Sequence, residues 1–231
     1  MNRDQAIQSD ETQATASPNG NHRQKMPRMG ISPSVQLRRH FVALARQIKQ
    51  WSNVRSRPLK IGVTSLERRV GKSTVAFNLA AALTRIETDK VLLLEADFGK
   101  HFLSRRLGRA GAPGLSELIL TGISPSECIL ETPLDDLFVL GSGHISEQES
   151  VELPFDLLDP ILNNNFDEFG YLVFDLPVAC DLTSCYSILP SLDGVMIVVD
   201  ADKIDRKQIC RAKQKLTGCD SELIGLVINQ A

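Results

Sequence analysis

Residues 61–74 read IGVTSLERRVGKST, and this stretch decides the fold of the chain. An apolar strand pattern stands directly before a Gly-Lys-Ser-Thr turn, and an alanine-rich helical pattern, VAFNLAAALTRI, follows. Phosphate binding needs that order, because the N–H groups that open the helix face the anion. Gly71 allows close backbone approach, Lys72 would reach the β- and γ-phosphate oxygens, and Ser73 would offer a hydroxyl to Mg²⁺. The stretch therefore predicts a nucleotide-binding loop; the alternative is a surface turn with an incidental lysine.

The first half of the loop departs from the usual phosphate-binding pattern. Leu66 stands where the usual spacing places a glycine, and Arg68 and Arg69 occupy positions that often hold glycine or proline. A phosphate nest commonly uses positive φ, which costs a non-glycine residue roughly 1–2 kcal/mol. Two arginines could offset this cost by charge-assisted hydrogen bonds to phosphate, or they could mark a loop that has drifted from catalysis. We expect the nucleotide contacts to come from Arg68, Arg69, Val70, Gly71, Lys72, Ser73 and Thr74.

Apolar runs and helical patterns alternate over the rest of the chain. Strands are expected at 59–65, 90–95, 137–140, 171–175, 194–200 and 222–229. Helices are expected at 35–51, 72–86, 114–120, 155–163 and 203–216. Apolar runs separated by helices predict an α/β fold with a mostly parallel sheet that is covered by helices on both faces.

Two of the apolar runs end in acidic residues. VLLLEADFGK ends with Glu95 and Asp97, and YLVFDLP ends with Asp175. An unpaired acid is costly to bury, and ligands of parallel sheets bind at the carboxyl ends of the strands. Mg²⁺ that bridges nucleotide phosphates takes one or two carboxylates, whereas the alternatives are helix capping by Asp97 and a turn role for Asp175. We predict that Ser73, Asp97 and Asp175 hold the metal.

Charge and composition divide the chain into three parts. Residues 1–58 contain ten Lys and Arg against three acids, which gives about +7, so the remainder carries about −9 of the net −2. Residues 1–34 are polar and are expected to be disordered, 35–58 to form an amphipathic helix and a linker, and 59–231 to form the nucleotide-binding domain. The basic front end suggests an acidic partner surface, nucleic acid or an anionic membrane face, with a solvated tail as the alternative.

The helix expected at 35–51 carries one apolar stripe, which consists of Leu37, Phe41, Leu44, Ile48 and Trp51. It either packs on the domain or docks a partner subunit.

The five cysteines include no C-x-x-C pair and fit a reducing compartment. No apolar run is long enough to span a bilayer, and the polar N-terminus does not resemble a signal peptide.

Six motifs occur in a fixed order: VTS…VGKSTVAFNLAAAL, VLLLEADFGK, GLSELI, YLVFDLP, DGVMIVVD and LIGLVINQ. Together they resemble the bacterial tyrosine kinases of capsule and exopolysaccharide assembly, which share a P-loop superclass with the partition and division-site-placement ATPases. The resemblance covers about residues 35–231. It implies a P-loop NTPase of the deviant-Walker class that uses ATP and Mg²⁺.

The resemblance also assigns roles to residues. It implies that Lys72, with Ser73 and Thr74, holds phosphate and magnesium. Asp97 matches the second acid of the D-x-D strand end, and Asp175 matches the Walker B acid. Lys72, Asp97 and Asp175 are thus the expected catalytic residues, and Asn229 matches a residue that contacts adenine in relatives.

Several positions depart from the family pattern. The Pro-Gly-Glu-Gly-Lys loop of the kinases reads Arg-Arg-Val-Gly-Lys at 68–72. Glu95 replaces the first acid of D-x-D, and its longer side chain is expected to reposition the metal. Glu67 stands where the partition-type relatives place a signature lysine, which argues against their mechanism. The oligomerisation motif Glu-x-x-Arg-x-x-Arg survives at best as Gln36 and Arg39.

The kinases usually end in a tyrosine cluster, whereas this chain has only Tyr171 and Tyr186. Two function classes therefore stay open. The first is an ATP-dependent tyrosine-protein kinase that regulates exopolysaccharide or capsule synthesis and export. The second is a catalytically degenerate, nucleotide-binding regulatory subunit; a partition-type ATPase is a third interpretation.

The expected partners follow from the resemblance and from the lack of a membrane span. They are ATP, a separate membrane-embedded activator of polysaccharide export, and further copies of the chain in a homo-oligomer. No specific nucleic acid is expected. The expected location is the cytoplasm or, after recruitment, the inner face of the membrane.

Overall fold

The computed structural model describes residues 35–52, 58–98, 100–146, 149, 153–154, 157–179 and 188–230. The tail predicted to be disordered at 1–34, the linker residues 53–57 and Tyr186 lie outside the described residues. Within the described ranges, no helix combines the length and the apolar character that crossing a membrane requires.

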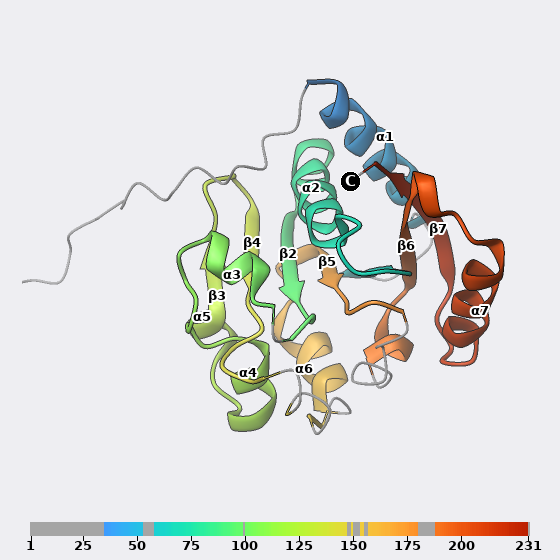
Figure 1. Cartoon of the computed structure of the whole chain (residues 1–231). Coiled ribbons are helices and arrows are strands. Elements are labelled where there is room, and N and C mark those ends of the chain that lie inside the picture. The colour runs from blue at the N-terminus through green and yellow to red at the C-terminus, as the bar shows by residue number, and fades with distance from the viewer. Residues whose placement is uncertain are drawn as a thin grey trace, which may run out of the picture.

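Seven strands form one sheet in the order β3-β4-β2-β5-β1-β6-β7 (Figure 1). All neighbouring strands are parallel except β3 and β4, which pair antiparallel. The α/β fold with a mostly parallel sheet is therefore confirmed, and β3 is a strand that the sequence patterns did not predict. The strands are β1 Leu59–Ser65, β2 Lys90–Glu95, β3 Ile129–Glu131, β4 Leu137–Leu140, β5 Phe169–Asp175, β6 Gly194–Asp200 and β7 Leu223–Asn229.

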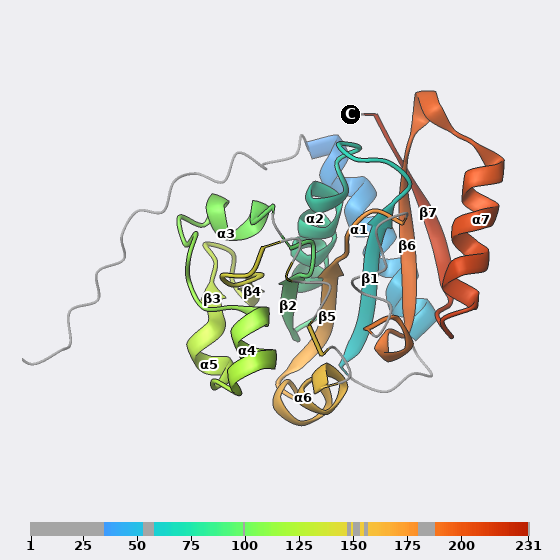
Figure 2. The same ribbon diagram turned by 60° about the horizontal axis from the view of Figure 1, so that its bottom comes forward.

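Helices cover both faces of this sheet, as Figures 1 and 2 show. On one face, α1 packs on α2, and residues of both join one apolar core. On the other face, α4, α6 and α7 contribute to a second core. The helices are α1 Val35–Ser52, α2 Lys72–Ile86, α3 Phe102–Arg106, α4 Leu115–Thr121, α5 Pro125–Cys128, α6 Leu158–Asn165 and α7 Arg206–Thr217.

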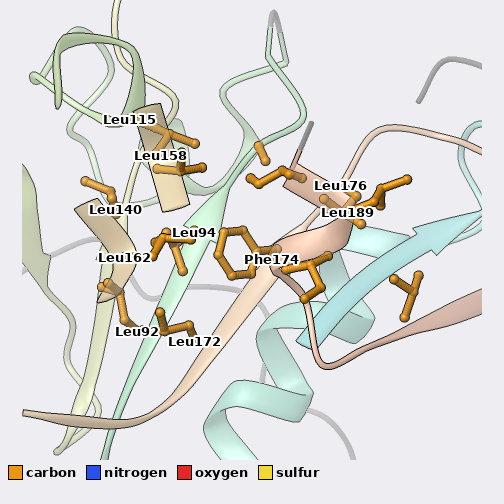
Figure 3. Close-up of a cluster of buried hydrophobic side chains, with 14 of the residues drawn as sticks. Leu92, Leu94, Leu115, Leu140, Leu158, Leu162, Leu172, Phe174, Leu176 and Leu189 are labelled. Atoms are coloured by element: carbon orange, nitrogen blue, oxygen red, sulfur yellow. The ribbon is translucent and has the colours of Figure 1, made fainter. Parts of the chain in front are cut away.

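Alternating side chains of the central strands supply the two cores. In β2, Val91 and Leu93 face the layer of α1 and α2, whereas Leu92 and Leu94 face the layer of α4 and α6. A strand that is apolar on both faces must be covered on both, so its sequence reads as a continuous apolar run. Figure 3 shows part of the second core, including Leu92, Leu94, Leu115, Leu140, Leu158, Leu162, Leu172, Phe174, Leu176 and Leu189.

The apolar stripe of α1 packs on the domain over most of its length. Phe41 and Ile48 are buried in the core shared with α2, and Leu44 and Trp51 are half-buried against it. Leu37, at the start of the stripe, is 40% exposed. The packing interpretation thus accounts for four of the five stripe residues.

The helix expected at 203–216 begins three residues later, at Arg206, as α7. The 3-10 turn η4 (Ala201–Lys203) comes first, and its cap Asp200 accepts a hydrogen bond from the backbone N–H of Asp202 at 3.1 Å. Asp205 then caps α7 by accepting from the backbone N–H of Lys207 at 2.8 Å. Because a capping residue has a non-helical backbone, the cap at Asp205 separates α7 from the 3-10 turn that contains Lys203.

Candidate nucleotide-binding site

The turn at Gly71–Thr74 joins β1 to α2 at the carboxyl edge of the sheet. Gly71 has a φ of +80°, and a Cβ atom at this position would lie 2.5 Å from Nδ2 of Asn229. Glycine is therefore required both by its backbone conformation and by the close contact. Ser73 and Thr74 are half-buried in the first turn of α2. This is the loop-to-helix arrangement that binds anions, because the first N–H groups of a helix have no intrahelical partner.

The arginine half of the loop also adopts a strained conformation. Arg69 has a φ of +66°, which is the positive φ expected for a phosphate nest at a position without glycine. Arg68 and Arg69 are exposed, and Val70 between them and Gly71 is buried. Contact between the two arginines and phosphate stays a prediction.

The ammonium group of Lys72 lies between two acids from neighbouring strands. Its Nζ is 2.9 Å from Oδ2 of Asp97 and 2.6 Å from Oδ1 of Asp175, and it also donates to the carbonyl of Leu176. All three ionic side chains are buried. The fold therefore brings together Lys72, Asp97 and Asp175, the three expected catalytic residues.

This arrangement keeps Lys72 charged. Burial alone would lower the pKa of Lys72, but the negative charges of Asp175 and Asp97 outweigh burial and hold this pKa above its ordinary value. An ammonium group has three N–H donors, and Asp97, Asp175 and the Leu176 carbonyl engage all three. Lys72 must release at least one of these partners before it can bind a phosphate oxygen.

The two carboxylates fit a magnesium ion that arrives with a nucleotide. Oδ2 of Asp175 is buried without a hydrogen-bond partner, which leaves an acceptor for an ion or an ordered water. The described residues contain no group of three or more His, Cys, Asp or Glu side chains that could hold a metal. Magnesium usually binds through one or two carboxylates plus phosphates and waters. Asp97 and Asp175 therefore suit a nucleotide-bound ion better than a free one, and the metal contact of Ser73 stays a prediction.

Asn229, at the end of β7, contacts the loop itself. Its Nδ2 donates to the backbone carbonyl of Val70 at 2.9 Å and lies directly over Gly71. The strand pairing places Asn229 beside Asp200 at the same carboxyl edge as the loop. The adenine contact implied by the resemblance stays a prediction; the contact that the structure shows is with the loop.

Glu95 is buried at the end of β2, where neutral donors surround it. Oε1 accepts from the backbone N–H of Leu103 at 2.7 Å, and Oε2 accepts from the hydroxyl of Ser104 at 2.9 Å. The backbone N–H of Ser142 adds a longer contact at 3.4 Å. These bonds hold α3 and the segment after β4 in place. The contacts of Glu95 therefore do not support the expectation that it repositions the metal.

Glu67, at the position of the partition-type lysine, faces a cation from the segment after β6. Lys203 Nζ lies 3.6 Å from Oε2 of Glu67 and 3.5 Å from Oδ2 of Asp200. The Glu67 and Lys203 side chains are both exposed, so the pair contributes little to stability. The charge reversal at Glu67 is thus matched by a nearby lysine.

Sequence reasoning missed Lys100, whose Nζ lies 2.6 Å from Oδ2 of Asp97. Its position three residues after Asp97 was the available signal. The donors to Glu95 were also missed, because Ser104 and Ser142 lie 9 and 47 residues away in sequence. Only the packing of α3 and β4 beside β2 brings them together.

No family model matches the sequence. The chain is 25% identical over 189 residues to tyrosine-protein kinase YwqD of Bacillus subtilis, which covers 82% of this chain and 75% of that protein. It is 25% identical over 171 residues to tyrosine-protein kinase CpsD of Streptococcus agalactiae, which covers 74% of each protein. A 24% match to the succinoglycan biosynthesis transport protein ExoP of Rhizobium meliloti covers 74% of this chain and 22% of that protein. The resemblance to the bacterial tyrosine kinases of capsule and exopolysaccharide systems is confirmed.

Solved structures share the fold. The chimerical protein CapA2B2 has a TM-score of 0.73 at 24% identity, covering 83% of each chain. The kinase domain of the Escherichia coli tyrosine kinase ETK has a TM-score of 0.72 at 18% identity, covering 82% of this chain and 75% of that one. A plasmid partition protein of Borrelia burgdorferi bound to AMPPNP has a TM-score of 0.62 at 20% identity, covering 74% and 73%. Kinase domains and partition proteins thus share the P-loop NTPase fold predicted for this chain.

Proposed function

We propose that the protein is an ATP-dependent protein-tyrosine kinase that regulates the synthesis and export of capsule or exopolysaccharide. The observation that carries this proposal is the position of Lys72, buried between Asp97 and Asp175 at the carboxyl edge of the sheet. Its homologues are named as tyrosine-protein kinases, and the same edge of the sheet carries the anion-binding turn.

Catalysis in this proposal comes from positioning and from charge neutralisation. ATP binds over the Gly71–Thr74 turn, where backbone N–H groups and Lys72 balance the phosphate charge. Asp97 accepts the proton of the attacking tyrosine hydroxyl. Mg²⁺, held by Ser73, Asp97 and Asp175, would offset the negative charge that develops on the phosphates.

The second candidate is a nucleotide-binding regulatory subunit without phosphoryl transfer. Two observations favour it: all three donors of Lys72 are engaged within the protein, and the strained Arg69 occupies the loop. Such a loop could bind nucleotide without turning it over. A partition-type ATPase has less support, because Glu67 reverses the charge of the signature lysine.

The proposed setting is the cytoplasm, next to a membrane-embedded activator carried on a separate chain. The similarity to the transport protein ExoP supports a link to polysaccharide export. A homo-oligomer is part of the proposal, with α1 as the helix that corresponds to the oligomerisation helix of the kinases.

Phosphate transfer to tyrosine tests the proposal. Purified protein is incubated with MgATP, and intact-mass spectrometry and phosphotyrosine detection follow. Tyr171 is fully buried in β5, so any stable autophosphorylation should fall on Tyr186, and Tyr186→Phe should abolish it while Tyr171→Phe should not.

Each outcome separates the two candidates. Nucleotide binding together with phosphotyrosine on the chain or on an added tyrosine polymer supports the kinase. Nucleotide binding without any phosphotyrosine supports the regulatory subunit. More than two added phosphates would contradict this proposal, because the sequence contains two tyrosines and the excess would lie on other residues.

A further inference from the structure

Helix α7 carries an uncompensated basic surface. Its twelve residues include five Lys or Arg and no acid, and all five cations are exposed. None of the five forms an ion pair with any part of the chain that the structure describes. The buried residues of α7 are Ala212 and Leu216, on the opposite side of the helix. The five cations are Arg206, Lys207, Arg211, Lys213 and Lys215.

The spacing of these cations works against the helix. Lys207, Arg211 and Lys215 follow at steps of four residues, so they form one row with about 6 Å between neighbours. Like charges at this spacing repel one another. Arg206 and Lys207 also stand in the first turn, where the helix dipole disfavours cations. An external anionic surface would relieve both effects.

Acidic residues lie only beyond the two ends of α7. Asp205 precedes the helix and caps it, and Asp220 and Glu222 follow it. The basic surface is therefore confined to the outward arc of the helix. In Figures 1 and 2, α7 lies at the outer side of the sheet, beyond β7. A flat surface that approaches from this side meets the outward arc first.

Three large apolar side chains are exposed on the segments next to α7, one just before its cap and two on β7. Ile204, which directly precedes the cap of α7, is 48% exposed, Leu226 is 45% exposed, and Ile228 is 63% exposed. In β7, Leu226 pairs with Ile197 and Ile228 pairs with Val199. Ile197 and Val199 belong to the core that includes Ala212 and Leu216 of α7, so Leu226 and Ile228 point to the face of the sheet that α7 partly covers.

This combination distinguishes between possible partners. A second copy docked symmetrically through α7 would set cations against cations. Single-stranded nucleic acid is bound with aromatic stacking, and residues 188–230 contain no aromatic side chain. Cations beside exposed aliphatic side chains suit a lipid interface, where the charges meet anionic headgroups and the apolar groups enter the boundary region.

We propose that α7 and the exposed side chains of Ile204, Leu226 and Ile228 dock the protein onto an anionic lipid bilayer. This docking goes beyond the proposed kinase activity and does not depend on it, because it needs neither nucleotide nor the Lys72 site. Its consequence is that the protein can lie at the membrane surface without a spanning helix of its own among the described residues.

Flotation with lipid vesicles tests the proposal on the full chain. Vesicles of phosphatidylcholine alone are compared with vesicles that contain about 30% phosphatidylglycerol, at about 50 mM and about 300 mM salt. We expect binding only to the anionic vesicles and weaker binding at the higher salt. Lys207→Gln/Arg211→Gln/Lys215→Gln should weaken binding at least about tenfold.

Matched variants assign the effect to this surface. Arg105→Gln/Arg106→Gln/Arg109→Gln removes three exposed cations of and just after α3 and should bind like the wild type. Ile228→Ser should weaken binding more than Leu120→Ser, which removes a similarly exposed side chain elsewhere (58% exposed). Circular dichroism shows whether each variant is folded. If the triple variant of α7 is not folded, the difference in vesicle binding between Ile228→Ser and Leu120→Ser tests the proposal.

Several results would overturn the proposal. One is that the wild type does not bind anionic vesicles at low salt. Another is that the α7 and α3 triple variants lose vesicle binding to the same extent. Binding of duplex DNA but not vesicles, lost in the α7 variant, would identify a nucleic-acid surface instead. A dimer in analytical ultracentrifugation that the α7 substitutions dissociate, without vesicle binding, would identify a second copy as the partner.

Discussion

Glu95 and Asp97 lie two residues apart at the carboxyl end of β2, and both are buried, yet their surroundings differ in kind. Neutral donors from Leu103, Ser104 and Ser142 surround the carboxylate of Glu95. The carboxylate of Asp97 faces two cations, Lys72 and Lys100.

The difference separates a structural carboxylate from a reactive one. A carboxylate satisfied by fixed neutral donors stabilises the segments that supply them, and it has no reason to exchange partners. A carboxylate paired with a movable lysine can release that lysine to an arriving phosphate and take an ion in its place. Glu95 therefore fixes α3 beside the site, and we expect Asp97 to take part in the proposed chemistry.

Lys72→Met should give the largest effect, because the ammonium group of Lys72 neutralises the buried carboxylates of Asp97 and Asp175. Two buried carboxylates would lose their shared cation, which should destabilise the fold by about 3–5 kcal/mol. The affinity for MgATP should fall about 100-fold or more, since a charge-assisted phosphate contact is lost. Urea unfolding and calorimetry measure the two effects.

Lys100→Met is the control for this prediction, because Lys100 also pairs with Asp97 but its side chain is 39% exposed. It should change stability by less than about 1 kcal/mol. If Lys72→Met folds too poorly to titrate, adding Asp97→Asn removes one of the two facing charges and should restore part of the stability. Equal MgATP affinity in wild type and Lys72 variants would contradict the nucleotide-site assignment.

Glu95→Gln and Asp97→Asn test the comparison directly. In Glu95→Gln, the NH₂ group of the new amide would face the hydrogen-bond donors that now surround the carboxylate. The free energy of unfolding should therefore fall by about 1–3 kcal/mol, while the affinity for MgATP should not change. Asp97→Asn should do the reverse, with a smaller loss of stability and an affinity for MgATP that falls about tenfold or more. Unfolding and titration of both variants decide; similar profiles for the two would remove the distinction.

Asn229→Ala tests whether Asn229 supports the phosphate-binding loop or contacts the adenine base of the nucleotide. If its hydrogen bond to the Val70 carbonyl is its role, the affinities for ATP and GTP should fall together, by about three- to tenfold. If Asn229 reads adenine, only ATP binding weakens and the preference for ATP over GTP shrinks. Titrations with both nucleotides distinguish the two results, and we expect the first.

Arg69→Gly and Arg68→Gly compare two adjacent arginines with different backbones. Arg69 has a φ of +66°, so glycine should relieve strain and stabilise the fold by about 0.5–1 kcal/mol. Arg68 is not among the residues with positive φ, so its glycine variant should destabilise by a similar amount. If the arginines contact phosphate, either change also lowers nucleotide affinity and its salt dependence, which titrations at two ionic strengths measure.

Glu117→Gln extends the comparison to a further carboxylate, which backbone N–H groups and the imidazole of His144 hold. Burial would raise the pKa of Glu117, but hydrogen bonds from the backbone N–H groups of Gly114 and His144 outweigh it and hold this pKa below its ordinary value. Because the folded-state pKa is lowered, the stabilisation is present above the unfolded pKa of about 4.3 and is lost as the pH falls through the folded value.

The wild type should therefore exceed Glu117→Gln in unfolding free energy by about 1 kcal/mol at pH 7, and this gap should narrow progressively as the pH falls below about 4. Unfolding curves at both pH values measure the gap. A gap that is unchanged in acid would show that Glu117 acts through packing and not through its charge.

The sequence by itself determined the elements that depend on local pattern. Six of the seven strands, the longer helices, the Gly71–Thr74 turn and the acids at the ends of β2 and β5 could be read from periodicity and motif spacing, because those signals are contained in neighbouring residues. Parallel strands also bring their carboxyl ends to one edge, so the meeting of Lys72 with Asp97 and Asp175 followed from the topology.

Only the tertiary structure decided which partner each polar group takes. Glu95 and Asp97 look alike in sequence, and packing of α3 and β4 beside β2 alone gives Glu95 its neutral donors. The contact between Asn229 and the Val70 carbonyl joins residues 159 positions apart, and β3 is a strand only because β4 pairs with it. Such choices depend on distances between segments that are remote in the chain, and a local pattern carries no information about those distances.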